Sequence, residues 1–176
     1  MKIEKIEDAY TANAYIKNKL TAAVEKLSDE QALRSSDPAV WSAQHLVEHI
    51  TIVDEGILRI CDKLLSKAEA DGLASDGRCQ LSDEFKMKTA AAADEKLTAP
   101  DFVHPTGSPT IAESLAKLNE TDEKFQALKD RFLRFDGEKH KFPHPIFGDI
   151  SAHEWLILRG GHAARHLRQI EARLAA

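Results

Sequence analysis

The chain has 176 residues, a formal net charge of -5 at pH 7, 43% hydrophobic residues and 30% charged residues. A chain of this length buries one sizeable core, so we expect a single domain spanning residues 1–176. The negative charge and the lack of a Lys/Arg run argue against general nucleic-acid binding. No window has the length of a membrane span or the apolar centre of a signal peptide, so a cytoplasmic protein is expected.

Helical periodicity dominates the first half of the chain. One helix is predicted from about Ile6 to Leu27. A second is predicted from near Ser42 to about Ala70, and its apolar stripe at three-and-four spacing consists of Leu46, His49, Ile50, Val53, Ile57, Ile60 and Leu64. A glycine-containing loop over 71–80 follows, and a lesser helix is predicted over Asp83–Leu97.

Two capping boxes mark the starts of the later helices. Thr110 with Glu113 begins a helix that ends near Phe135, and Ser151 with Glu154 begins the last one. The stripe of the last helix contains Trp155, Leu158, His162, His166, Gln169, Ile170 and Leu174. Almost no stretch alternates as a strand does, so 136–150 is predicted to be a loop. The predicted fold is therefore all-α: a four-helix bundle with a crossover connection, and an extra short helix or long loop between the second and third main helices.

The segment His45-Leu46-Val47-Glu48-His49 matches H-x-x-E-H, the pattern of one class of zinc peptidases. That interpretation makes Glu48 essential and requires a third ligand. On a helix, His45 lies about 40° from His49 at the edge of the core stripe, and Glu48 lies about 100° from His49. Glu48 is therefore expected to point away from a site built on His49. His49 is the favoured ligand, with binding by both His45 and His49 as the alternative.

His162 and His166 lie four residues apart, so both imidazoles reach one ion from the same helix face. Both interrupt an apolar stripe, where an unpaired polar group costs about 1 to 3 kcal/mol. A shared metal ion satisfies both, and the alternative is a pair of histidines hydrogen-bonded to carboxylates or water. His49 is the best-placed third ligand from another helix.

The other histidines, charged residues and cysteines considered are predicted to have no part in the metal site. His104, His140 and His144 lie in polar or proline-rich loops and are predicted to be on the surface. His153 is about two and a half turns from His162, too far to share an ion with it. Arg159 and Arg165 are predicted to form helix-surface salt bridges, with binding of an anionic substrate as the alternative. The remaining predictions are a solvated Asp54, a core position for Cys61 and a loop thiol at Cys79.

Three motifs together resemble those of the DinB-like four-helix metalloproteins, which are related to bacterial low-molecular-weight-thiol transferases. The first is Trp41-Ser42 with His49 eight positions after the tryptophan. The second is Gly148 followed by Glu154-Trp155-Leu156, and the third is His162-x-x-x-His166-Leu167-x-Gln169-Ile170. The resemblance covers nearly the whole chain. It implies an up-down-down-up bundle, often a homodimer, in which the matching residues His49, His162 and His166 hold a divalent ion.

Zinc or nickel is the expected ion, and manganese or iron also accepts imidazole ligands. The resemblance also implies a function. We expect a metal-dependent enzyme of thiol S-transferase or hydrolase type that acts on a small molecule such as bacillithiol, mycothiol or glutathione. No catalytic acid or base is assigned. One alternative is a non-catalytic dimeric bundle with a structural or vacant metal site, and the other is the H-x-x-E-H peptidase.

Overall fold

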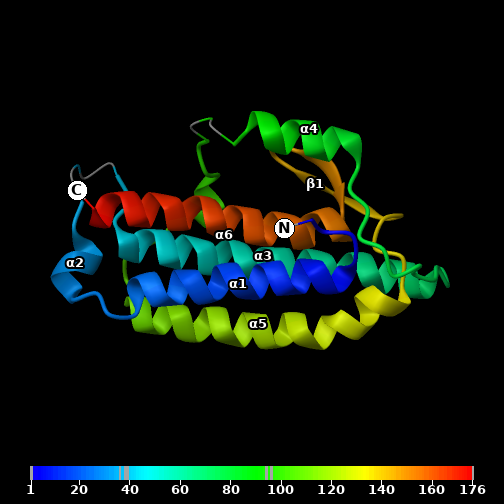
Figure 1. Ribbon diagram of the computed structural model, residues 1–176, viewed down its shortest axis with the longest axis horizontal. Coiled ribbons are helices and arrows are strands. Elements are labelled where there is room, and N and C mark those ends of the chain that lie inside the picture. The colour runs from blue at the N-terminus through cyan, green and yellow to red at the C-terminus, as the bar shows by residue number, and fades with distance from the viewer. Residues whose placement is uncertain (1, 36, 38–39, 94, 96, 176) are drawn as a thin grey trace.

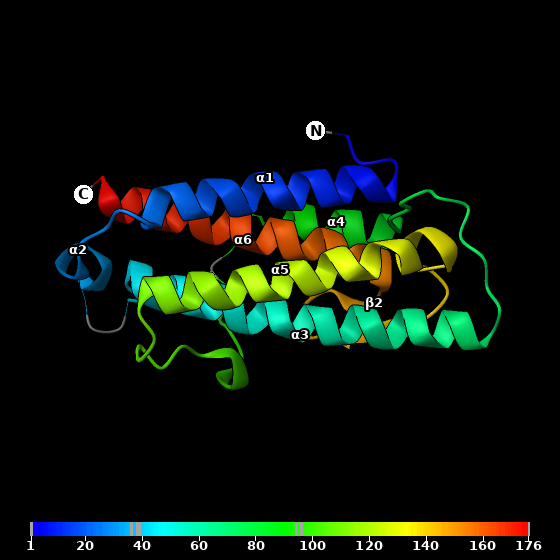
Figure 2. The ribbon, with the colours of Figure 1, turned by 90° about the horizontal axis from the view of Figure 1, so that it is seen from below.

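The computed structural model describes residues 2–35, 37, 40–93, 95 and 97–175. Its body consists of four long helices: α1 (Ile6–Val24), α3 (Ala43–Ala70), α5 (Ile111–Arg134) and α6 (Ala152–Leu174). These helices lie side by side along the long axis, and α1 and α6 run opposite to α3 and α5 (Figures 1 and 2). The predicted up-down-down-up four-helix bundle is therefore confirmed.

The predicted caps begin the helices that carry the candidate site. Ser42 accepts a hydrogen bond from the backbone N–H of His45 at the start of α3. Thr110 and Ser151 form the predicted capping boxes at the starts of α5 and α6. Each cap satisfies backbone N–H groups that the first helical turn leaves free. These caps therefore mark where α3 and α6 begin.

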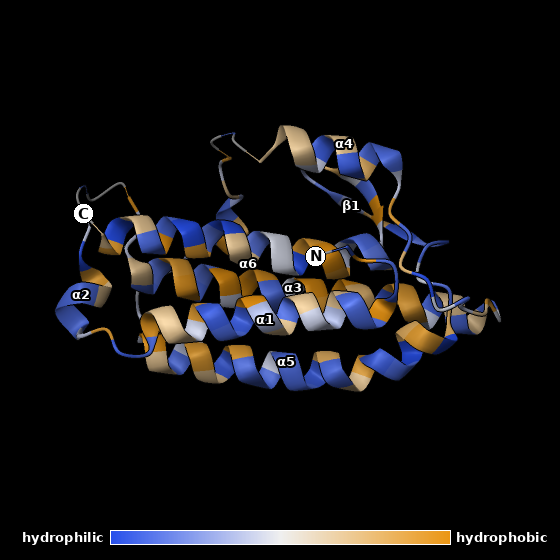
Figure 3. Ribbon diagram, viewed as in Figure 1, coloured by the Kyte–Doolittle hydropathy of each residue, from blue (hydrophilic) through white to orange (hydrophobic). Residues whose placement is uncertain are grey.

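The core lies between the four long helices. α3 packs against both α5 and α6, and α1 packs against α6 and α5. Hydrophobic residues recur along each long helix between hydrophilic ones, as amphipathic packing requires (Figure 3). Cys61 lies in this core as predicted. Cys79 lies in a loop as predicted, but it is buried as well. Of the described helices, none combines the length and apolar content needed to cross a membrane.

Some predicted boundaries were wrong. The first helix ends at Val24, and a short helix, α2 (Asp29–Leu33), follows it. Its signal was present, because Ser28 and Gln31 form a capping box. The predicted extra helix between the second and third main helices is α4 (Asp83–Ala91), which is shorter than predicted, and a 3-10 turn, η1 (Asp101–Val103), lies beyond it.

The prediction of a loop over 136–150 was also wrong, because two short strands form there. β1 (Lys141–His144) pairs antiparallel with β2 (Gly148–Ser151). Gly148 closes the turn with a φ of 76°, a conformation that glycine adopts without strain. Strands of four residues are too short to show a clear period of two, so the pattern could not reveal them.

Candidate metal centre

His49 from α3 and His162 and His166 from α6 bring their Nε2 atoms together. The Nε2 atom of His162 lies 3.1 Å from that of His49 and 3.1 Å from that of His166. One ligand atom from each of these residues lies within 4.8 Å of the other two. Nitrogens bound to one tetrahedral zinc ion at about 2.0–2.1 Å would be about 3.3 Å apart. The spacing therefore fits three ligands of a single ion.

The protons on two of these rings are placed by partners outside the cluster. His49 Nδ1 donates to the backbone carbonyl of Val103 at 2.7 Å, and His166 Nδ1 donates to Oε1 of Gln169 at 2.9 Å. A neutral imidazole with its proton on Nδ1 has a lone pair on Nε2. Two lone pairs thus face His162 Nε2, which carries at most one proton. A cation would satisfy all three nitrogens, which is why this donor set fits a metal.

Burial keeps these imidazoles neutral. It lowers the pKa of His49, it lowers the pKa of His166 to about 4, and it lowers the pKa of His162 well below the ordinary value. The neighbouring rings of His166 and His49 lower the pKa of His162 further. Neutral imidazole is the form that binds metal, so the three rings are ready as ligands at neutral pH.

The partly buried ring of Trp41 packs against His49. The centroids of the two rings are 4.9 Å apart, and the Trp41 ring also meets the edge of the His104 ring at 5.5 Å. Trp41 lies just before the Ser42 cap, so two turns of helix bring His49 beneath it. This contact is the physical reason for the eight-residue spacing. The His104 side chain is 45% exposed, in agreement with its predicted surface position.

The other two residues of the H-x-x-E-H motif face away from the cluster. His45 Nδ1 lies 2.8 Å from the Ser42 hydroxyl, and His45 does not belong to the group of three imidazoles. Glu48 is buried, and its carboxylate accepts hydrogen bonds from Thr106 and Gly107. The prediction that Glu48 leaves the site agrees with this position. Its carboxylate is already engaged and is not presented to the cluster as a general base.

Comparison with known proteins now identifies the family. The family model described as the DinB superfamily matches residues 16–170, a range that includes all three histidines. The chain belongs to the DinB superfamily. It is 23% identical over 146 residues to the uncharacterized protein YuaE of Bacillus subtilis (strain 168), covering 82% of this chain and 84% of that protein. A solved structure described as TT2238, a four-helix bundle protein, has a TM-score of 0.61 and 17% identity, covering 94% of this chain and 96% of that one. This second likeness supports the fold alone.

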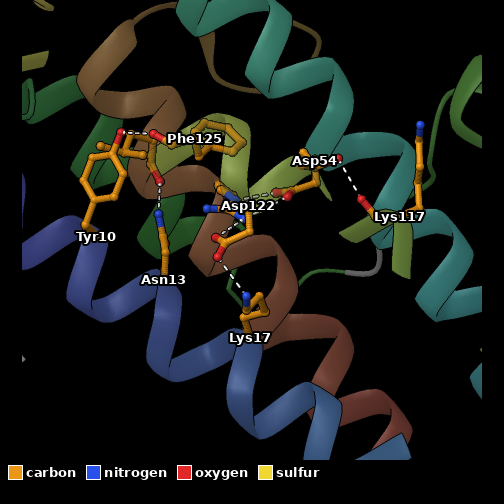
Figure 4. A network of polar contacts seen from close by, with 10 residues as sticks. Tyr10, Asn13, Lys17, Asp54, Lys117, Asp122 and Phe125 are labelled. Carbon is orange, nitrogen blue, oxygen red and sulfur yellow. Dashed lines mark hydrogen bonds and ion pairs between the residues drawn. The ribbon is translucent and has the colours of Figure 1, made fainter. Parts of the chain in front are cut away.

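This DinB-superfamily bundle holds a buried ion-pair network that we did not predict. Arg159 binds Asp54 through Nε and Nη2, and its Nη2 also binds Asp122 at 3.0 Å. Asp122 in turn accepts from Lys17 at 2.8 Å (Figure 4). The predictions of a solvated Asp54 and a helix-surface Arg159 were wrong, because each charge finds a partner inside the bundle. Burial opposes the ionised form of Asp122, but the bonds from Lys17 and Arg159 lower the pKa of this carboxyl.

The prediction for Arg165 was wrong as well. Its guanidinium donates to the backbone carbonyls of Ala92, at 3.0 Å, and Ala93, at 3.2 Å, and also to that of Glu95. These acceptors lie at and just beyond the end of α4. Arg165 therefore ties α4 to α6 next to His166 instead of forming a surface salt bridge.

The histidines left out of the predicted site lie outside the cluster, but two are less exposed than their segments suggested. His144 packs between Phe147 and Trp155, with ring centroids 4.6 and 5.2 Å away, so the predicted surface position was wrong. His153 is 2% exposed and stacks on Phe132. His140 is partly exposed and bonds Asp71 at 2.8 Å. Burial lowers the pKa of His144 to about 4.

Proposed function

We propose that this DinB-superfamily protein is a metal-dependent enzyme in which His49, His162 and His166 hold one divalent ion. The observation that carries the proposal is the pair of Nε2 lone pairs that His49 and His166 direct at His162. Without a cation, His162 donates a proton to only one of them. Zinc or nickel is the proposed ion, and manganese or iron would also accept imidazole ligands.

The ligand set bears on the reaction. Three neutral imidazoles would leave a bound divalent ion its full charge, and such an ion would lower the pKa of a thiol or a water molecule that binds to it. His49 and His166 contribute by keeping their Nδ1 protons turned away from the site. Trp41 contributes by covering His49 and so limiting the access of water to that ring.

The surroundings of the three imidazoles bear on whether the substrate is a thiol or water. Among the described residues, no carboxylate oxygen belongs to the imidazole group, and the carboxylate of Glu48 is engaged elsewhere. A thiol with an ordinary pKa of about 8.5 reaches its nucleophilic anion with a small shift, whereas water starts near 15.7. We therefore propose S-transfer from a low-molecular-weight thiol, with hydrolysis as the second candidate.

Metal binding is tested by elemental analysis. The purified protein is stripped of metal, incubated with zinc or nickel, and desalted before measurement. We expect the wild type to retain one ion per chain and His49→Ala and His162→Ala to lose it. His45→Ala is the matched control, because it removes an imidazole from the same helix but outside the cluster. Retention by His162→Ala with loss by His45→Ala would contradict the ligand set, and a wild type that binds no ion would contradict the proposal.

Substrate class is tested separately. Bacillithiol, mycothiol and glutathione are each offered with a generic electrophile, and the loss of free thiol is measured for the wild type and for His49→Ala. We expect metal-dependent conjugation with one of the thiols. An ion that binds without supporting conjugation or hydrolysis would favour the non-catalytic bundle. We also propose that the protein is a homodimer, as the resemblance implies, and light scattering measures the molar mass of the purified protein in solution.

A further inference from the structure

Glu48, the residue before His49, is buried and binds a loop segment that is distant in the sequence. Glu48 lies on α3 and is 5% exposed. Its Oε1 accepts from the backbone N–H and hydroxyl of Thr106 at 2.9 and 2.8 Å, and its Oε2 accepts from the N–H of Gly107 at 2.7 Å. Bonds to an ionised acceptor are about twice as strong as neutral ones. Glu48 therefore anchors this segment firmly.

Two further residues in the same part of α3 shape the contact. Gln44 donates to the carbonyl of Gly107 at 2.9 Å. A Cβ at Gly107 would lie 2.6 Å from Nε2 of His45, and the φ of Gly107 is 74°. Only glycine allows this close approach in that conformation without strain. Segment 103–107 is thus docked on α3 by hydrogen bonds to Gln44 and Glu48.

The same segment reaches a metal ligand. Its first residue, Val103, presents its carbonyl to His49 Nδ1 at 2.7 Å. His49 follows Glu48 directly, so one end of the segment is held by Glu48 while the other end binds the ring of the next residue. If the segment moved away, the Nδ1 proton of His49 would lose its acceptor. The ring would then be free to turn or to carry its proton on Nε2.

We propose that Glu48 is a positioning residue for the metal centre. By anchoring Thr106 and Gly107 it holds the Val103 carbonyl on His49, and this keeps the Nε2 lone pair of His49 directed at the other two imidazoles. The inference rests on the proposed function where it concerns metal affinity. Partners of ligating histidines typically change metal affinity by about 10- to 100-fold when they are removed. The glutamate of the H-x-x-E-H motif thus acts through the loop and not as a base.

The chain supplies a matched control at the other end of the bundle. Glu154 is also buried and accepts three hydrogen bonds: from the N–H and hydroxyl of Ser82, at 2.9 and 2.6 Å, and from the N–H of Ser151, at 2.7 Å. It anchors the segment before α4 in the way that Glu48 anchors 103–107. Glu154 lies eight residues before His162, about two turns of helix away. Glu154→Ala therefore removes a similar anchor without touching a partner of a metal ligand.

The experiment has two measurements on Glu48→Ala, Glu48→Gln and Glu154→Ala. The first is zinc affinity by competition with a chelator, in which Glu48→Ala is expected to bind about 10- to 100-fold more weakly than the wild type. The second is the ¹⁵N spectrum of histidine-labelled, metal-free protein, with the His49 signals identified by their loss in His49→Ala. His49 is expected to be protonated on Nδ1 in the wild type and on a mixture of both nitrogens in Glu48→Ala. Glu48→Gln keeps one acceptor for Thr106 and is expected to be intermediate.

The outcomes separate this proposal from the function on which it rests. Unchanged affinity and an unchanged His49 proton position in Glu48→Ala would overturn it. Equal effects in Glu154→Ala would also overturn it, because they would show general destabilisation. If the wild type binds no zinc, the proposed function and the effect on affinity both fail, and the spectrum of the metal-free protein alone decides whether Glu48 positions the ring.

Discussion

Arg159 donates two hydrogen bonds to the carboxylate of Asp54, with N–O distances of 2.6 and 3.0 Å, and both side chains are only 6% exposed. This ion pair joins α3 and α6, the two helices that carry the three imidazoles. Asp54 lies five residues after His49, and Arg159 lies three before His162. The pair therefore fixes the axial register of α3 against α6 close to the imidazole cluster.

Removal of one partner should be costly. We expect Asp54→Ala to lower the free energy of unfolding by about 3–5 kcal/mol, because it leaves a buried guanidinium with fewer partners. Asp62→Ala is the matched control, since Asp62 also lies on α3 and pairs with an arginine, Arg131, but is 57% exposed. Its expected loss is below about 1 kcal/mol. Urea unfolding measures both, and similar losses in the two variants would contradict the structural role given to the Asp54 pair.

Two adjacent glycines of α6 should respond in opposite ways to alanine. A Cβ at Gly160 would lie 2.2 Å from Oδ1 of Asn13, whose amide is held at 3.0 Å by the carbonyl of Leu156. We expect Gly160→Ala to cost about 1–3 kcal/mol, because the Asn13 side chain must give up its hydrogen bond to Leu156 or α1 must move away from α6. At Gly161 no described atom lies within 4 Å of the added Cβ.

Gly161→Ala is therefore the control, and the better helix propensity of alanine should raise stability by about 0.4–1 kcal/mol. For a chain of this size, each kcal/mol shifts Tm by about 2–4 °C. Thermal unfolding followed by circular dichroism distinguishes the two variants. A stabilised Gly160→Ala would show that the close approach of Asn13 is not tight.

Local signals made the main helices and two members of the imidazole cluster predictable. A capping box such as Thr110 with Glu113 involves residues three apart, so the sequence contains the whole interaction. The spacing of His162 and His166 likewise places both rings on one face. His49 could be selected as the third member because it lies on an apolar stripe, and the structure places its ring beside those of His162 and His166.

Contacts between distant segments were not predictable in the same way. Asp54 and Arg159 are 105 positions apart, and a charged residue on a helix is usually solvated, so nothing local indicated that the two are paired. The attachment of Thr106 to Glu48 spans 58 positions and depends on how the crossover connection folds. Such contacts are defined by the packed bundle, and sequence spacing does not reveal them.

The buried ring of His144 should make stability fall in acid. Its pKa is lowered to about 4 in the folded protein, whereas an unfolded histidine titrates near 6.5. Between these values the unfolded chain binds a proton that the folded chain does not, so stability is present above pH 6.5 and is lost as the pH falls toward 4. The loss from this residue is at most about 3 kcal/mol.

His144→Asn tests this expectation. Asparagine keeps a side-chain oxygen that accepts from the backbone N–H groups of Ile146 and Phe147, as His144 Nδ1 does. We expect the variant to lose less free energy of unfolding than the wild type between pH 6.5 and pH 4, measured by urea titration at several pH values. Equal slopes for the two proteins would contradict the assignment of this acid sensitivity to His144.

Zinc should stabilise the folded chain through the three imidazoles. An ion that binds only the folded state at about 100 times its Kd adds about 2.7 kcal/mol. For a chain of 176 residues this corresponds to a rise in Tm of about 5–11 °C. His162→Ala is expected to lose this rise, because it removes the ring that lies 3.1 Å from both of the others. His45→Ala is expected to keep the rise, and a chelator should reverse it in the wild type. A rise that persists in His162→Ala would place the stabilising ion elsewhere in the protein.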